Sequence, residues 1–292
     1  MDFYQINDLE RLSGIKAHTI RIWEKRYGII TPYRTETNIR YYDDLQLKKL
    51  LNVATLASSG LKISKIAALS SEELKSTIKE RKVDGEDAER YDFFINDLIS
   101  SMLDFNEQAF NLLFADILVQ FGVQKAFINI VYPFLSKTGV LWSIDETMPV
   151  QEHFATTIIK KKLFSLIEQL PAAKANKHKF LLFLPSDEWH ELGLLFAEYI
   201  IRESGNATIS LGQNVPFVDI DYVVKKVQPD FLLTFLISDV NKEEIGKIAN
   251  LLSQKFKKTT FLLCGNPSKL ISYADTNQIK VLQHPNDILK FI

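Results

Sequence analysis

The sequence predicts a multidomain fold that is helical over its first 171 residues and α/β from residue 176 onward. Between residues 90 and 170, apolar side chains recur at helical spacing, which is typical of a bundle of about four helices. After residue 171 the pattern changes to five short apolar runs that alternate with helical stretches, which indicates an open, doubly wound parallel sheet of the flavodoxin-like type. The first 70 residues differ from both, because short helical patterns there flank a basic, tyrosine-rich segment.

The composition limits the class of protein. Hydrophobic residues make up 46% and charged residues 24% of the 292, which is ordinary for a globular protein. The formal net charge of −1 excludes a chain that is basic throughout, so any surface for nucleic acid must be local. The single cysteine, Cys264, excludes a disulfide framework and a cysteine-rich zinc site. The chain does not begin like a signal peptide, and its apolar runs are much shorter than the roughly 20 residues of a membrane span. We therefore expect a cytoplasmic protein with no membrane partner.

The first 70 residues, called the head below, carry the pattern of a DNA-binding domain. A helix is expected over 6–13, ended by Gly14, and a second over 20–27, with Thr19 or its neighbour near the cap. Two short helices joined by a turn with glycine form a helix-turn-helix. Residues 14–40 hold six basic and two acidic side chains, a local charge of +4 suited to phosphate. Residues 32–42 then predict a hairpin wing with Asn38 at its turn.

This stretch resembles the MerR family of transcriptional regulators through an ordered series of matches. The matching segments are Thr19-Ile-Arg-Ile-Trp-Glu24, Arg26-Tyr27-Gly28, Pro32-x-Arg34-Thr35 and Arg40-Tyr41-Tyr42. The resemblance implies a winged helix-turn-helix over residues 1–70 that binds double-stranded DNA. The alternative is that these side chains only cover the surface of a small domain, and Trp23 is expected to pack in its core. The side chains that the resemblance places at the DNA are Thr19, Arg21, Arg26, Tyr27, Arg34, Arg40, Tyr41 and Tyr42.

Three further regions are expected after the head. Residues 71–89 are charged and nearly free of large apolar groups, so they predict a linker or an exposed helix end. Residues 90–171 predict the four-helix bundle, and residues 176–292 predict the sheet domain. The expected strands are 180–184, 208–211, 231–236, 260–264 and 279–282, and the helical stretches between and after them are 188–204, 218–227, 242–256, 268–274 and 286–292.

A possible metal ligand lies directly after the first strand. In an open α/β sheet, ligands bind beyond the carboxyl ends of the strands, and this loop contains Glu188-x-His190-x-x-Gly193. Imidazole suits a borderline metal such as cobalt, and a ligating histidine usually donates its other ring N–H to a carboxylate such as that of Glu188. Because Gly193 has no side chain, a bulky group could approach the backbone there.

The loop resembles the Asp/Glu-x-His-x-x-Gly signature of cobalamin-binding domains. The resemblance implies that His190 is the lower axial ligand of cobalt, and that the nucleotide tail of the cofactor enters the sheet. A Ser-x-Leu element of that family is matched by Thr234-Phe-Leu236, and a Gly-Gly pair by Cys264-Gly265, where the first glycine is lost. The side chain of Cys264 is expected to crowd the tail pocket.

The bundle segment resembles cobalamin photoreceptor regulators of the CarH/LitR type. Trp142 is followed by nine residues and then Glu152-His153, as in the part of those proteins that covers the upper face of the corrin. The resemblance implies that these three side chains line the pocket of an adenosyl group. The residue after the tryptophan is commonly histidine in that pattern, whereas here it is Ser143, a poor cobalt ligand.

Together these patterns predict a DNA-binding regulator, not an enzyme, that senses adenosylcobalamin. By resemblance it would be a repressor that assembles as a dimer or tetramer through its C-terminal domains, with a possible response to light. One alternative is a regulator of the same fold that senses another corrinoid, another ligand or a protein partner. A corrinoid methyl-carrier protein is a further alternative, which the DNA-binding head disfavours.

Overall fold

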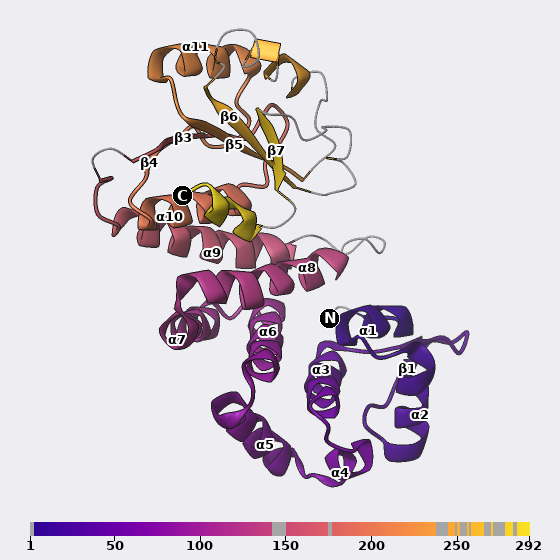
Figure 1. Cartoon of the computed structure of the whole chain (residues 1–292). Helices are drawn as coiled ribbons and strands as arrows, with labels where there is room; N and C mark the ends of the chain where they lie inside the picture. The colour runs from indigo at the N-terminus through magenta and orange to yellow at the C-terminus, as the bar shows by residue number, and fades with distance from the viewer. Residues whose placement is uncertain are drawn as a thin grey trace. The chain divides into compact units, whose positions relative to one another are not determined.

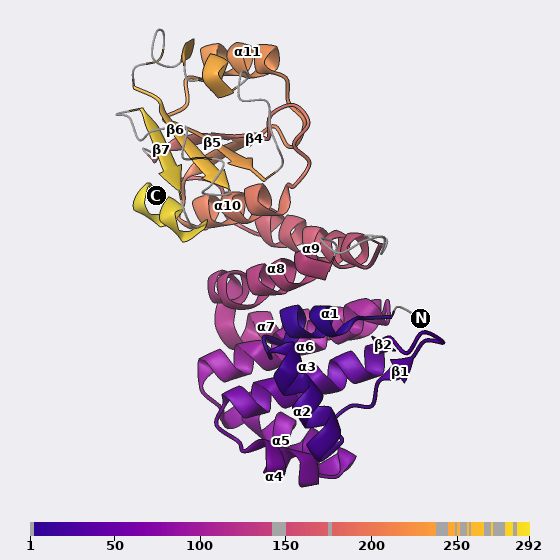
Figure 2. The ribbon, with the colours of Figure 1, turned by 90° about the vertical axis from the view of Figure 1, so that its right-hand side faces the viewer.

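The chain divides into two compact units, residues 1–158 and residues 159–292, called unit 1 and unit 2 and described separately here. The boundary between the two units lies inside helix α9 (Val150–Glu168), which is labelled in Figures 1 and 2. The computed structural model describes residues 3–141, 150–174, 177–237, 245–248, 250–251, 256, 258–265, 270, 278–282 and 285–292.

Unit 1 begins with the predicted helix-turn-helix and wing. Gly14 ends the first helix with a φ of 72°, and Asn38 takes a φ of 65° at the wing turn, so both act as their residue types predict. The wing strands are antiparallel. The elements of the head are α1 (Ile6–Ser13), α2 (Ala17–Tyr27), β1 (Tyr33–Arg34), β2 (Arg40–Tyr41), α3 (Asp44–Ser58) and α4 (Ile63–Ala68).

Helix α2 begins at Ala17, three residues before the sequence predicts. The reason is a carboxylate from the preceding helix: Glu10 accepts the backbone N–H of Ala17 at 2.8 Å and the ammonium of Lys16 at 3.1 Å. These hydrogen bonds lower the pKa of Glu10. Glu10 thus accepts a free backbone N–H at the start of α2, which is the capping role expected of Thr19 or its neighbour. Thr19 lies inside the helix, two residues after its first residue.

Helices α6, α7 and η1 contribute large aromatic side chains to the core of unit 1, whereas α5 does not. Helix α5 has a capping box between Ser70 and Glu73 and no buried residue, so the predicted charged linker is helical. Gly122, with a φ of 71°, kinks the long helix α7. These helices are α5 (Ser71–Asp84), α6 (Asp87–Leu103), α7 (Glu107–Ala126), the π-helix η1 (Phe127–Val131), α8 (Tyr132–Leu141) and α9 (Val150–Glu168), whose second half belongs to unit 2.

The head packs directly against these helices within unit 1. Asn96 of α6 is 4% exposed, and its amide donates to the hydroxyl of Thr55 on α3 at 3.1 Å. The ammonium of Lys48 lies 2.8 Å from the carboxylate of Asp104. Helix α1 also contacts α8. The head is therefore held by a buried polar contact as well as by apolar packing.

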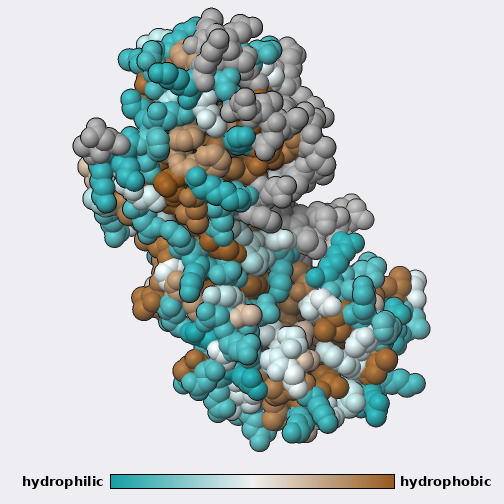
Figure 3. All heavy atoms as spheres, viewed as in Figure 1, coloured by the Kyte–Doolittle hydropathy of each residue, from teal (hydrophilic) through white to brown (hydrophobic). Residues whose placement is uncertain are grey.

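One helical stretch of the described chain, Glu107–Thr138, is long and apolar enough to cross a membrane by length and composition. The same pattern is usual for the core helix of a globular bundle. Phe110 and Phe134 of this stretch are fully buried and meet edge to face. On the face viewed in Figure 3, hydrophilic and hydrophobic residues are interspersed over unit 1. Phe110, Phe114 and Phe134 of Glu107–Thr138 belong to the core of unit 1, whereas Leu112 and Val119 are exposed.

Unit 2 contains the predicted five-stranded parallel sheet, in the order β4-β3-β5-β6-β7. Helix α10 and the 3₁₀-helix η2 contact each other on one face, and α11 packs on the other (Figure 1). The predicted helices at 242–256 and 268–274 lie largely outside the described residues. The elements are β3 (Lys179–Leu182), α10 (Leu192–Glu203), β4 (Ala207–Ser210), α11 (Phe217–Val227), β5 (Phe231–Leu236), β6 (Thr260–Gly265), β7 (Ile279–Leu282) and η2 (Pro285–Lys290).

Strand register assigns each side chain of the central strands to one face of the sheet. Paired residues of parallel strands share a face, and successive residues alternate. Leu232 and Leu236 of β5 belong to the apolar cluster that includes Ile220 and Val224 of α11. Phe235, which pairs with Cys264 of β6, therefore points to the opposite face, toward α10.

We predict that Asn96→Ala lowers the free energy of unfolding of unit 1 by about 1–2 kcal/mol, because it removes a buried hydrogen bond between α6 and α3. Chemical denaturation followed by circular dichroism measures this change. Gln108→Ala, an exposed amide removed from α7, is the matched control, expected within about 0.5 kcal/mol of wild type. Equal effects of the two substitutions would contradict the prediction.

Candidate functional site

The basic side chains of the head are mostly available at its surface. Arg21 and Arg26 of α2 and Arg34 of β1 are exposed. Thr19, Tyr27, Arg40 and Tyr41 are partly exposed. The second helix and the wing of the helix-turn-helix therefore present the positive charge that the sequence predicts at this end of the chain.

Tyr42 is placed differently from the expectation. It is fully buried, and its hydroxyl donates to Glu24 of α2 in a short hydrogen bond. Burial first, and then this contact, raise the pKa of the Tyr42 hydroxyl, so it stays protonated as a donor. The guanidinium Nε of Arg40 lies 3.5 Å from the other oxygen of Glu24. In this structure Tyr42 belongs to the core of the head, and Glu24 couples the wing to α2.

An aromatic side chain of the wing was missed by the sequence reasoning. Tyr33 is 48% exposed, and its ring stacks on that of Tyr41 with 5.4 Å between centroids. The pairing of Tyr33 with Tyr41 across the hairpin could have been expected, because cross-strand neighbours lie on one face. Next to it, Arg34 donates to the side-chain oxygen of Asn38 at 2.6 Å, which holds the guanidinium at the wing turn.

The loop between β3 and α10 contains a buried carboxylate that organises an exposed imidazole. Glu188 has no exposed surface, and its Oε1 accepts the backbone N–H groups of Trp189 and His190, each at 3.0 Å. The same oxygen lies 2.6 Å from Nδ1 of His190. The other oxygen, Oε2, accepts the backbone N–H of Ile237, just after β5, at 2.8 Å. The carboxylate therefore links two strand ends and fixes one histidine ring.

This arrangement determines which ring nitrogen of His190 suits a metal. A carboxylate only accepts hydrogen bonds, so Nδ1 donates and Nε2 carries the lone pair. The side chain of His190 is 58% exposed, so a large ligand can reach it. Among the described residues, no group of three or more His, Cys, Asp or Glu side chains is arranged to hold a metal ion. The donor set is thus one oriented imidazole, which suits a cobalt whose other ligands come from a macrocycle.

The other residues of the predicted cofactor site lie around the same strand ends, but on two faces of the sheet. Thr234 is fully buried, on the face shared with Leu232 and Leu236, and its hydroxyl has no hydrogen-bond partner in the described part of the chain. Gly265 ends β6 with a φ of 150°, and a Cβ there would lie 2.2 Å from the carbonyl oxygen of Leu236. Position 265 must therefore be glycine, because any side chain there would clash with the backbone of β5.

Cys264 occupies the position where the resemblance expects a glycine, and it is 4% exposed. Burial raises the pKa of its thiol to about 12, so the side chain is neutral. It lies beside Phe235 on the face of α10. The expected crowding by Cys264 is therefore shared with an aromatic ring that the sequence reasoning did not consider.

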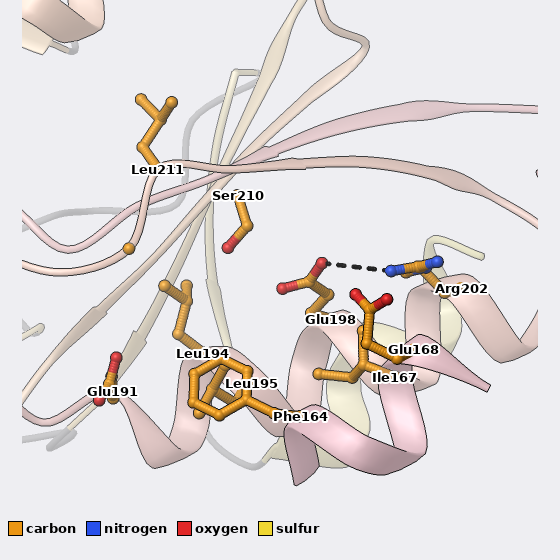
Figure 4. A pocket seen from close by; sticks show the side chains of 11 residues that line it. Phe164, Ile167, Glu168, Glu191, Leu194, Leu195, Glu198, Arg202, Ser210 and Leu211 are labelled. Atoms are coloured by element: carbon orange, nitrogen blue, oxygen red, sulfur yellow. Dashed lines mark ion pairs between the residues drawn. The ribbon is translucent and has the colours of Figure 1, made fainter. Parts of the chain in front are cut away.

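A cavity of about 340 Å³ is present elsewhere in unit 2, along α9, α10 and the end of β4 (Figure 4). Glu198 lies 3.9 Å from Arg202 inside it and also accepts the hydroxyl of Thr208 at 3.2 Å. None of Gly193, Thr234, Phe235 and Cys264 lines this cavity.

The predicted upper pocket is only partly described. Trp142 and Ser143 lie outside the described residues. Glu152 and His153 are adjacent in the first turn of α9, with 3.3 Å between the carboxylate of Glu152 and Nδ1 of His153. The imidazole of His153 is 71% exposed.

Comparisons with known proteins agree with this architecture. A family model described as MerR HTH family regulatory protein matches residues 4–73. The HTH-type transcriptional repressor CarH of Myxococcus xanthus is 27% identical over 254 residues, which are 86% of this chain and 84% of CarH. The HTH-type transcriptional repressor CarA of the same organism is 25% identical over 247 residues, covering 84% of this chain and 80% of CarA.

A solved structure is similar to about two thirds of the chain in fold. The monomethylamine corrinoid protein of Methanosarcina barkeri superposes with a TM-score of 0.53 at 12% identity, over 66% of this chain and 94% of that protein. At that identity the likeness shows a common fold. Residues 4–73 thus match the MerR helix-turn-helix family model, the chain is similar to the repressors CarH and CarA over most of its length, and its C-terminal sheet has a fold like that of the monomethylamine corrinoid protein.

Proposed function

We propose that this protein is a transcriptional repressor that binds operator DNA through its head and a corrinoid through His190. The observation that carries the proposal is the Glu188–His190 pair, with its 2.6 Å contact and exposed imidazole at the carboxyl edge of the sheet. The names of CarH and CarA as transcriptional repressors support the regulatory role. The exposed arginines of α2 and the wing support DNA as the partner.

The residues of the β3–α10 loop fit the lower side of a corrinoid. His190 would donate Nε2 to cobalt, and Glu188 would hold the imidazole in the required tautomer. A bound corrinoid would supply a cobalt centre whose upper ligand can change, which is chemistry that side chains do not provide. The space beside Gly193 fits the tail of a complete cobalamin poorly, because Phe235 occupies it.

The finer expectations from the sequence belong to the same proposal. The CarH/LitR resemblance suggests adenosylcobalamin, with Glu152 and His153 near its adenosyl group, whereas the packing of Phe235 against Gly193 favours a corrinoid without the nucleotide tail. A response to light would depend on Ser143, because serine is a poor substitute for a histidine that binds cobalt. Ligand-controlled assembly of a cytoplasmic dimer or tetramer would set how many heads reach one operator at once.

A corrinoid methyl-carrier protein is the second candidate, supported by the common fold with the monomethylamine corrinoid protein. The head argues against it, since a carrier has no need of a DNA-binding domain. We therefore favour a regulator without catalytic activity.

We predict that Arg21→Ala weakens binding to the operator by at least tenfold and reduces the salt dependence of binding by about one unit of slope, because one phosphate contact is lost. Fluorescence anisotropy at several salt concentrations measures both quantities. Lys75→Ala removes a similarly exposed positive charge from α5, outside the head, and is expected to change neither. Identical behaviour of the two variants would refute the assignment of α2 to DNA.

We predict that His190→Ala abolishes the spectral signature of imidazole coordination to a corrinoid, and that Glu188→Gln weakens corrinoid affinity about 10–100-fold. Visible absorption spectra after desalting, together with titrations, measure these effects. His178→Ala is the matched control, because His178 is also an exposed imidazole of unit 2, 3.8 Å from the carboxylate of Asp230. A wild-type spectrum from His190→Ala would reject His190 as the ligand.

A further inference from the structure

We infer that Phe235, with Cys264 beside it, packs between the sheet and α10 so closely that it makes the His190 site selective for corrinoids without a nucleotide tail. The inference rests on the proposed function, because it concerns the ligand of the same site. It names a class of ligand, the incomplete corrinoids that end before the lower nucleotide.

The contact between Phe235 and Gly193 carries the argument. A Cβ added to Gly193 would lie 2.7 Å from Cδ1 and 2.8 Å from Cε1 of the Phe235 ring. Ordinary carbon contacts are about 3.5–4.0 Å, so the ring lies against the backbone of the first turn of α10. The absence of a side chain at Gly193 therefore makes room for the protein's own aromatic ring. The planar base of a nucleotide tail would need room for van der Waals contact on both of its faces, and the Phe235 ring already occupies this space.

The neighbouring position closes the cleft further. Phe235 and Cys264 are paired in register on adjacent strands and are 5% and 4% exposed. A glycine at 264 would leave space beside the ring, whereas the thiol fills it. Two adjacent positions on the α10 face thus carry side chains where a tail would need room.

The hydroxyl of Thr234, which has no hydrogen-bond partner in the described part of the chain, does not offset this packing. Thr234 shares its face with Leu232, Leu236 and Leu263, on the side of the sheet opposite Phe235. A group inserted between the sheet and α10 would meet Phe235 and Cys264 before it reached that hydroxyl. The loop that holds His190 lies outside this packing and keeps its imidazole exposed.

Phe235 is therefore a specificity-determining residue. A complete cobalamin must displace a buried phenylalanine ring to insert its tail, and burying such a ring is a large favourable contribution to folding. A cobinamide, which has the corrin ring but no nucleotide, leaves Phe235 in place and still presents cobalt to His190.

The test compares the binding of aquocobinamide and hydroxocobalamin to the full chain, with imidazole coordination as the spectral readout. A complete cobalamin must also release its own base before His190 can bind, so the decisive quantity is how each substitution changes the ratio of the two affinities. Wild type is expected to bind cobinamide at least tenfold more tightly than cobalamin. Phe235→Ala and Cys264→Gly are each expected to shift this ratio toward cobalamin, by tenfold or more for Phe235→Ala.

Phe180→Ala is the matched control, because Phe180 is a buried aromatic on the α10 face at the opposite end of β3. It is expected to lower stability without changing the ratio. If wild type binds both corrinoids equally with imidazole coordination, the inference is overturned while corrinoid sensing stands. If wild type binds neither, corrinoid sensing itself is overturned. If Phe235→Ala does not fold, the change in the ratio caused by Cys264→Gly decides the question, and an unchanged ratio in that variant overturns the inference.

Discussion

The buried carboxylate of Glu188 is the interaction on which the candidate site depends. A carboxylate without exposed surface is stable only when its lone pairs are satisfied, and here three backbone N–H groups and one imidazole nitrogen serve that purpose. Because one donor is the backbone of Ile237, the loop after β3 and the end of β5 are joined. The orientation of His190 therefore depends on the hydrogen bond between Glu188 and the backbone at the end of β5.

The head uses a carboxylate in a related way. Glu24 of α2 accepts the hydroxyl of Tyr42 and lies beside the guanidinium of Arg40, so a single acidic side chain joins the recognition helix to the wing. Glu10 plays a smaller role, since it caps α2 from the preceding helix. Glu24 thus positions Arg40 and Tyr42, and Glu10 positions Lys16 at the start of α2.

The sheet shows why a motif match and a ligand pocket are different things. Thr234 and Leu236 match the motif, but strand alternation turns Phe235 toward α10 and into the space beside Gly193. The loop leaves the imidazole of His190 exposed, while the space beside Gly193 is packed with protein side chains. The residue proposed to select among corrinoids, Phe235, therefore lies between two motif positions.

The sequence by itself determined the order of the regions, the helix-turn-helix with its wing, the five strands and the Glu188–His190 pair. These features depend on local periodicity, turn residues and spacing, which can be read along the chain. The tertiary structure decided that Tyr42 is buried on Glu24, that Asn96 bonds to Thr55 across two helices, and that Phe235 meets Gly193. Each of these contacts joins residues far apart in sequence, so its geometry arises only when the elements pack and each face is assigned.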